Sequence, residues 1–138
     1  MKTYFVTGAS GAIGSALIPL LLDDPDTRVR LLLRAASTDE LDARLEALYA
    51  FWQVAPTDRQ TRSRVSALRG DVTAPAFGVD DDAYRSLCSE CTHLVHAAGN
   101  VRMNLPIAQA RHCSVDSTRH LVELAQRCQR LEKVDFVS

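Results

Sequence analysis

The sequence lacks the features that mark membrane-spanning, secreted or nucleic-acid-binding proteins. No apolar run approaches the roughly 20 residues that a membrane-spanning helix needs. The first residues contain one lysine and then a predicted strand, without the apolar core or cleavage site of a signal peptide. A formal net charge of −1 gives no electrostatic reason to expect a nucleic acid or an anionic membrane as partner. We therefore expect a soluble, cytoplasmic protein, whose 138 residues form one globular domain.

Disulfides and metal ligands are also not expected. Without a secretion signal, the cysteines should be free thiols; they are Cys88, Cys91, Cys113 and Cys128. The spacing of Cys88 and Cys91, followed by His93 and His96, is compatible with zinc. However, residues 92–97 are predicted to form a short buried strand, in which alternate side chains face opposite sides. The two histidines would then point apart, and we expect no metal site.

A glycine-rich segment close to the N-terminus carries the strongest functional signal. Residues 7–14 read Thr-Gly-Ala-Ser-Gly-Ala-Ile-Gly and directly follow an apolar run at residues 4–6. Glycine permits positive φ and a close approach of the backbone to a phosphate. The predicted helix that follows begins with unpaired N–H groups and the positive end of its dipole. A strand, this turn and a helix in that order predict a site for a dinucleotide pyrophosphate, rather than a glycine-rich turn without a ligand.

Predicted strands and helices alternate along the chain, which is typical of an α/β protein with a parallel sheet. Strands are expected at residues 2–6, 28–33, 65–69, 92–97 and 133–137. Helices are expected at residues 12–22, from residue 38 to about residue 52, at residues 80–88 and at about 106–130. Pro19 should kink the first helix, and Ser37 with Glu40 forms a capping box at the start of the second. Residues 56–64 are expected to be a polar linker. The expected fold is a doubly wound parallel sheet of five strands, in the order 3-2-1-4-5, with helices on both faces.

Ligands of such sheets bind beyond the strand C-termini, where the strand order reverses. That point lies between the first and fourth strands, so residues 8–14 and 97–99 are expected to flank one crevice. The second strand ends at Arg34, where an NAD site typically has Asp or Glu. A guanidinium suits a 2′-phosphate, so NADP(H) is favoured, while NAD(H) stays possible. Arg44 is either a second cation for that phosphate or a surface charge.

Further motifs narrow the class of protein. They are Leu32-Leu33-Arg34-Ala35, Arg44-Leu45 with Trp52 beyond it, Gly70-Asp71-Val72, His96-Ala97-Ala98-Gly99-Asn100-Val101 and Val134-Asp135-Phe136-Val137-Ser138. Together with the glycine-rich segment, these stretches resemble the N-terminal part of an extended short-chain dehydrogenase/reductase. Within that superfamily the chain is most similar to the NAD(P)-binding domain of thioester reductases, carboxylic acid reductases and fatty acyl-CoA reductases. The resemblance covers essentially all residues and implies a Rossmann fold and NADPH-dependent hydride delivery to an acyl thioester.

The resemblance also implies a role for each matching residue. The pyrophosphate would be held by Gly8, Ser10, Gly11, Ala12 and Ile13. Arg34, together with Arg44, would meet the 2′-phosphate, and Asp71 and Val72 would border the adenine. Ala97, Ala98 and Gly99 would pass beneath the ribose and the nicotinamide. Asp71 also has a plainer interpretation, because an Asp after Gly in a turn often bonds nearby backbone.

Two departures from the family pattern concern catalysis. Such enzymes resemble one another in using a Tyr-x-x-x-Lys pair, but the only lysines here are Lys2 and Lys133, and neither follows a tyrosine at that spacing. Ser138 matches the first residue of the family's Ser-Ser/Thr doublet. We therefore expect a fragment that ends before the catalytic and substrate-binding half, and assign no catalytic residue. Ser114 and Ser117 stand where the family usually has Asn and Gly, which puts the catalytic competence of the parent protein in question.

Three functions remain open at this point. The chain is expected to be the NADP(H)-binding domain of an oxidoreductase, of the thioester or acyl-CoA reductase type. The alternatives are an NAD-dependent sugar-nucleotide epimerase or dehydratase of the extended family, against which Arg34 argues, and a non-catalytic NADP(H)-sensing regulator. We also expect self-association, because an apolar fifth strand at residues 133–137 would leave an open sheet edge.

Overall fold

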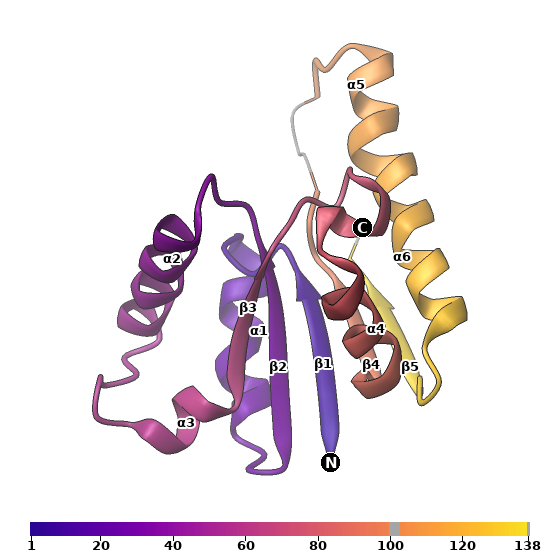
Figure 1. Cartoon of the computed structure of the whole chain (residues 1–138). Helices are drawn as coiled ribbons and strands as arrows, with labels where there is room; N and C mark the ends of the chain where they lie inside the picture. Colours follow the sequence, from indigo (N-terminus) through magenta and orange to yellow (C-terminus); the bar gives the residue numbers. More distant parts are fainter. Residues whose placement is uncertain (100–102, 138) are drawn as a thin grey trace.

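A computed structural model describes residues 1–99 and 103–137 of the chain (Figure 1). Its strands are β1 (Lys2–Thr7), β2 (Thr27–Leu33), β3 (Val65–Arg69), β4 (His93–His96) and β5 (Lys133–Phe136). They form one parallel sheet in the order β3-β2-β1-β4-β5. The strand order therefore reverses between β1 and β4, and the predicted doubly wound fold is confirmed.

Helices cover both faces of this sheet. α1 (Ala12–Leu22) and α2 (Thr38–Phe51) pack on one face, while α4 (Asp81–Glu90) and α6 (Ser117–Arg127) pack on the other. In Figure 1, α1 lies behind the sheet and α4 in front of it. The shorter elements include α3 (Arg59–Ser63), the 3₁₀ turn η1 (Pro75–Gly78) and α5 (Ile107–Arg111). No helix within the described ranges is long and apolar enough to cross a membrane.

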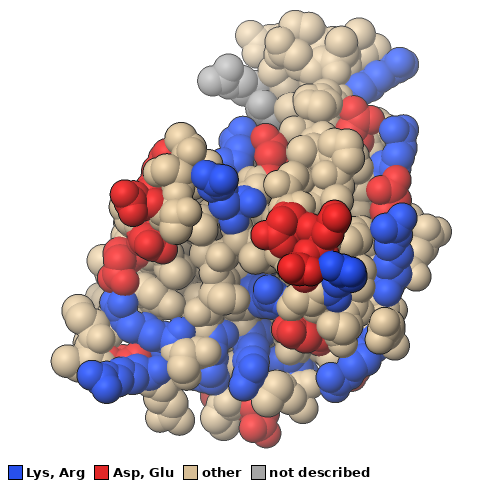
Figure 2. Space-filling view, in the orientation of Figure 1, with Lys and Arg blue, Asp and Glu red and all other residues tan. Residues whose placement is uncertain are grey.

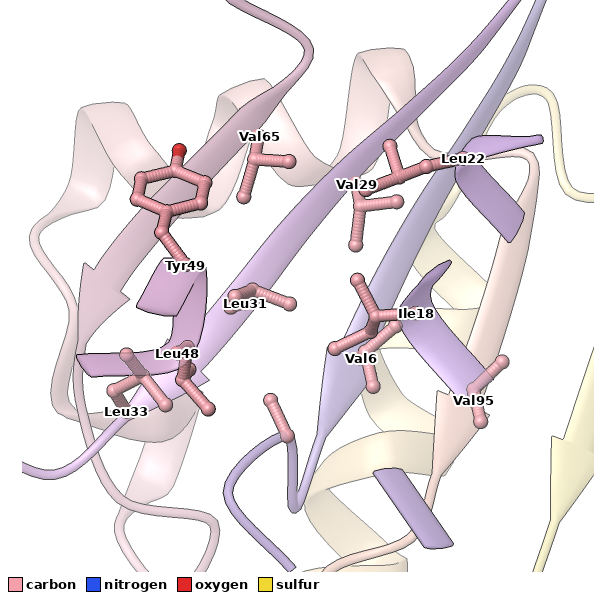
Figure 3. Packing of buried hydrophobic residues seen from close by; sticks show 11 residues of the cluster. Val6, Ile18, Leu22, Val29, Leu31, Leu33, Leu48, Tyr49, Val65 and Val95 are labelled. Atoms are coloured by element: carbon pink, nitrogen blue, oxygen red, sulfur yellow. The ribbon is translucent and has the colours of Figure 1, made fainter. Parts of the chain in front are cut away.

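Two apolar cores follow from the alternation of side chains along the strands. In β1, Val6 faces α1 and α2, whereas its neighbour Phe5 faces α4 and α6. Figure 3 shows the first core, in which Ile18 of α1 points toward Val6. Val6, Phe5 and Ile18 are all fully buried, and burying a side chain of this kind contributes about 1.5–3 kcal/mol. These cores hold the C-terminal ends of β1 and β4 next to each other.

The N-terminal caps of two helices agree in part with the sequence-based expectations. The hydroxyl of Ser37 accepts the N–H of Glu40 at 3.1 Å, as the capping box predicts. The carboxylate of Glu40 reaches the N–H of Ala36 at 2.8 Å, one residue before the cap. The predicted linker at residues 56–64 contains α3, because the carboxylate of Asp58 accepts the N–H of Thr61 and caps a short helix.

The helix predicted at about 106–130 is interrupted. A π-helical turn, η2 (His112–Asp116), separates α5 from α6, which ends at Arg127. The hydroxyls of Ser117 and Thr118 donate to the carbonyl oxygens of Cys113 and Ser114, each at 2.6 Å. Hydroxyl groups that bond a preceding carbonyl compete with the regular helical ladder, which explains why the turn widens here.

Candidate functional site

The turn after β1 is pressed against the turn after β4. Gly8 has a φ of 74°, and a Cβ at this position would lie 2.5 Å from backbone atoms of Ala97 and Ala98. A Cβ on Gly14, in the first turn of α1, would lie 2.1 Å from the carbonyl oxygen of Gly8. Neither position has room for a side chain. Gly11 is less constrained, because its Cβ would meet only the Gly8 oxygen, at 3.3 Å.

Thr7 joins the two turns through hydrogen bonds. Its hydroxyl lies 2.7 Å from Nδ1 of His96 and accepts the N–H of Ala98 at 3.3 Å. Its carbonyl oxygen accepts the N–H of Ala97 at 3.1 Å. Thr7 and His96 are buried, and burial lowers the pKa of His96, so the imidazole is neutral at pH 7. These contacts fix the position of both turns at the end of the sheet.

A cleft of about 450 Å³ opens above this joint. Most of the predicted residues line it: Gly8, Ser10, Gly11, Arg34, Arg44, Asp71, Val72, Ala97, Ala98 and Gly99. Ala12 and Ile13 do not line the cleft, but form the exposed first turn of α1 beside it. The N-cap of α1 is Gly11, which has no side chain to accept the first N–H groups of the helix. The cleft thus has an uncapped helix N-terminus at one wall, a feature that favours the binding of an anion.

A second hollow, of about 580 Å³, lies next to the cleft and shares several residues with it. We call it the arginine hollow, because it is lined by Arg34 after β2, Arg44 of α2 and Arg69 at the end of β3, together with Ala35, Ala36, Glu40, Gly70, Asp71 and Gly78. Figure 2 shows basic atoms gathered beside α2 at this end of the sheet. Arg69 was not among the predicted residues, although its place at the end of the strand next to β2 is visible in the sequence.

Several charged groups of this region are already paired. The Nε and Nη2 atoms of Arg44 donate to Glu40 at 3.1 and 2.8 Å. Oδ1 of Asp71 accepts the N–H and the hydroxyl of Thr73 at 2.9 and 2.7 Å. This oxygen therefore bonds a neighbouring residue of its own turn, as an Asp after Gly often does. Burial raises the pKa of Asp71, but the bonds from Thr73 and the electrostatic interactions with Arg34 and His112 outweigh burial and leave that pKa below its ordinary value.

Sequence reasoning missed other residues of the cleft wall. Leu32, Leu33, Gly70, Thr73 and Cys113 also line the cleft. His120 of α6 is buried, and its Nδ1 lies 2.8 Å from the carbonyl oxygen of Val72. The imidazole therefore donates to the loop after β3 and helps to hold that loop at the cleft. No local motif marks His120, because this contact joins residues far apart in the sequence.

The remaining predicted residues lie elsewhere. Ser114 is exposed in the π-helical turn, and Ser117 is buried at the start of α6. His93 stacks on Tyr4, with ring centroids 4.5 Å apart, on the sheet face opposite to His96. Within residues 1–99 and 103–137, no three His, Cys, Asp or Glu side chains are grouped as a metal site needs. Asn100, Val101 and Ser138, which carry part of the resemblance, lie outside the described residues.

Comparison with known proteins gives the family. The model of an NAD-binding family described as "male sterility protein" matches residues 6–138, and the chain belongs to this family. The isonitrile lipopeptide synthase of Streptomyces coeruleorubidus is 30% identical over 120 residues, which cover 87% of this chain and 8% of that protein. The glycine betaine reductase of Emericella nidulans is 28% identical over 131 residues, covering 91% of this chain and 10% of that protein.

Solved structures agree with this assignment. The terminal R domain from the myxalamid PKS-NRPS pathway superposes with a TM-score of 0.83 and 25% identity, covering 100% of this chain and 34% of that chain. The reductase domain of a non-ribosomal peptide synthetase from Mycobacterium tuberculosis gives 0.77 and 26%, covering 100% and 33%. The chain spans about a third of these solved domains, and its fold matches the part of these reductase domains that it covers.

Proposed function

We propose that the cleft binds NADP(H), and that the chain is the cofactor-binding part of a reductase acting on an acyl thioester. The observation that carries the proposal is the combination of an uncapped helix N-terminus at one wall of the cleft with Arg34 at the other. The reductase domains to which the chain is similar belong to PKS and non-ribosomal peptide synthetase systems, which supports a thioester as the substrate class.

In this proposal the pyrophosphate lies against the first turn of α1. The N–H groups of Ala12 and Ile13, in the exposed first turn beside the cleft, would donate to the anion together with the hydroxyl of Ser10, while Gly8 and Gly11 would leave room for it. The helix dipole adds favourable charge at this end. The joint between Thr7 and His96 keeps the floor of the cleft in place without a charge of its own, because that imidazole is neutral.

The adenosine half would extend toward the arginine hollow. Asp71 and Val72 border the adenine, and Arg34 with Arg44 meets the 2′-phosphate. Ala97, Ala98 and Gly99 lie beneath the ribose and the nicotinamide, where their small size lets the rings approach the backbone. A guanidinium can donate two hydrogen bonds to a phosphate, but it has no acceptor for the ribose hydroxyls of NAD(H). The arginines therefore favour NADP(H) over NAD(H).

The bound cofactor would supply the hydride of the reaction. The residues of this chain bind and orient it, and no tyrosine here has a lysine four residues on to handle the accompanying proton. We therefore place only cofactor binding in residues 1–138.

Calorimetric titration with NADPH and NADH tests the proposal. The unaltered chain should bind NADPH at least about tenfold more tightly than NADH, since hydrogen bonds to charged groups contribute about 1.5–3 kcal/mol. Arg34→Gln should remove most of that preference. Arg28→Gln, an exposed arginine at the opposite end of β2, is the matched control and should change neither affinity. Absence of binding would contradict the cofactor site, and equal binding of both nucleotides would contradict the preference for NADP(H).

A further inference from the structure

The carboxylate of Glu40 lies in the arginine hollow and accepts hydrogen bonds from groups of the kind that bind phosphate. Its Oε1 accepts both Nε and Nη2 of Arg44, and its Oε2 accepts the N–H of Ala36 at 2.8 Å. A guanidinium fork and a backbone amide are the groups that hold a phosphate monoester in many proteins. The other cations of the hollow are Arg34 and Arg69, and Arg69 donates to the carbonyl oxygen of Ala36 at 3.2 Å. The side chain of Glu40 therefore takes the hydrogen-bond donors that an anionic ligand of the hollow would use.

We propose that Glu40 is the resident counter-ion of the arginine hollow, and that it limits the affinity for a 2′-phosphate. This inference rests on the proposed NADP(H) function. In the free chain Glu40 holds Arg44; on binding, Arg44 turns to the phosphate, and Arg69 acts as a third cation beside Arg34.

The exposure of the pair permits this exchange. The side chain of Arg44 is 51% exposed and that of Glu40 38%, and exposed ion pairs at this helical spacing are weakly held. Hydrogen bonds from Ala36 and Arg44 lower the pKa of Glu40, so it is ionised at neutral pH. A phosphate monoester carries close to two negative charges, and these would be repelled by the Glu40 carboxylate. Removing that charge while keeping the shape of the side chain should therefore strengthen phosphate binding.

The test measures how Glu40→Gln changes binding of NADP⁺, NAD⁺ and adenosine 2′,5′-bisphosphate by calorimetry. NADP⁺ and the bisphosphate should bind about fivefold more tightly, as expected for one like charge removed in a solvated site, and NAD⁺ should be unchanged. The matched control is Glu46→Gln. Glu46 is an exposed glutamate of α2 that pairs with Arg62 at 2.7 and 3.1 Å and does not line the hollow. It should leave all three affinities unchanged.

A second variant tests the third cation. Arg69→Gln should weaken NADP⁺ and the bisphosphate by about fivefold and leave NAD⁺ unchanged. Arg59→Gln, an exposed arginine of α3 away from the hollow, is its control. Thermal melts of each variant check that the fold is retained.

The outcomes separate this inference from the proposed function. If the unaltered chain binds neither dinucleotide, the proposed function falls, and the inference with it. If it prefers NADP⁺ but Glu40→Gln leaves that preference unchanged or weakens it, the role of Glu40 alone is overturned. If Glu40→Gln weakens NAD⁺ specifically, Glu40 is a ribose ligand instead of a counter-ion.

Discussion

The indole N–H of Trp52 donates to the carbonyl oxygen of Ser15 at 2.8 Å. In an uninterrupted helix that oxygen would accept the N–H of the residue four positions on, but that residue is Pro19, which has no N–H. Trp52 thus supplies the donor that the proline lacks. α1 continues through Pro19 to Leu22, and the contact ties the end of α2 to the helix whose N-terminus forms the cleft wall.

This relationship predicts a dependence between two substitutions. Trp52→Phe should lower the free energy of unfolding by about 1–2 kcal/mol, because it leaves the buried Ser15 carbonyl without a donor. Pro19→Ala restores the backbone N–H, so in that background Trp52→Phe should cost about 1 kcal/mol less. Urea denaturation of the four proteins measures this coupling. Equal costs of Trp52→Phe in both backgrounds would show that the tryptophan contributes packing only.

His96 predicts a pH dependence of stability. Burial lowers its pKa in the folded chain below the ordinary 6.5, so the unfolded chain binds the proton first as the pH falls. The free energy of unfolding should decrease from about pH 6.5 down to the lowered pKa, and level off below it. His96→Asn, which keeps an acceptor for Thr7, should lack this decrease. Urea titrations at several pH values compare the two proteins, and parallel curves between about pH 6.5 and 5 would contradict the role of His96.

The two glycines of the turn should respond differently to a methyl group. Gly8→Ala combines a positive φ with a backbone clash at 2.5 Å and should cost about 2–4 kcal/mol. Gly11→Ala meets only one atom at 3.3 Å and should cost about 1 kcal/mol or less. Thermal denaturation of both variants provides the measurement. A Gly8→Ala protein as stable as Gly11→Ala would mean that the turns after β1 and β4 are not in close contact.

We expect the chain to self-associate through the outer edge of β5. Val134 and Phe136 are 42% and 53% exposed, and within the described residues no strand pairs with this edge. Sedimentation velocity should show species larger than a monomer at high concentration, and Val134→Lys should shift them toward the monomer. Val122→Lys on α6, where the valine is 48% exposed, should not. A monomer at all concentrations, or an equal effect of both lysines, would contradict association through β5.

The sheet was predictable because its strands are marked by buried apolar runs and separated by turn residues. The glycine-rich segment likewise marked the cleft, since Gly8 and Gly14 are required by local geometry. The π-helical turn was not predictable, because it depends on which carbonyl oxygens the hydroxyls of Ser117 and Thr118 bond. α3 was predictable in principle from Asp58 three residues before Thr61, a capping pattern that the polar composition of the segment obscured.

The residues that join distant segments could not be identified from sequence. His120 reaches the carbonyl oxygen of Val72, and Arg30 reaches Ser86 of α4 at 2.7 Å. Such contacts depend on how helices are placed on the sheet, which periodicity does not specify. The pairing of Arg44 with Glu40 was available from their spacing on one helix, but its position in the arginine hollow was not.

A crystal structure of the chain grown with NADPH tests the central claim most directly. The account predicts the pyrophosphate within hydrogen-bond distance of the N–H groups of Ala12 and Ile13, with the 2′-phosphate among the arginines of the hollow. A well-ordered crystal at saturating NADPH in which no nucleotide contacts the turn at Gly8–Gly11 would contradict it.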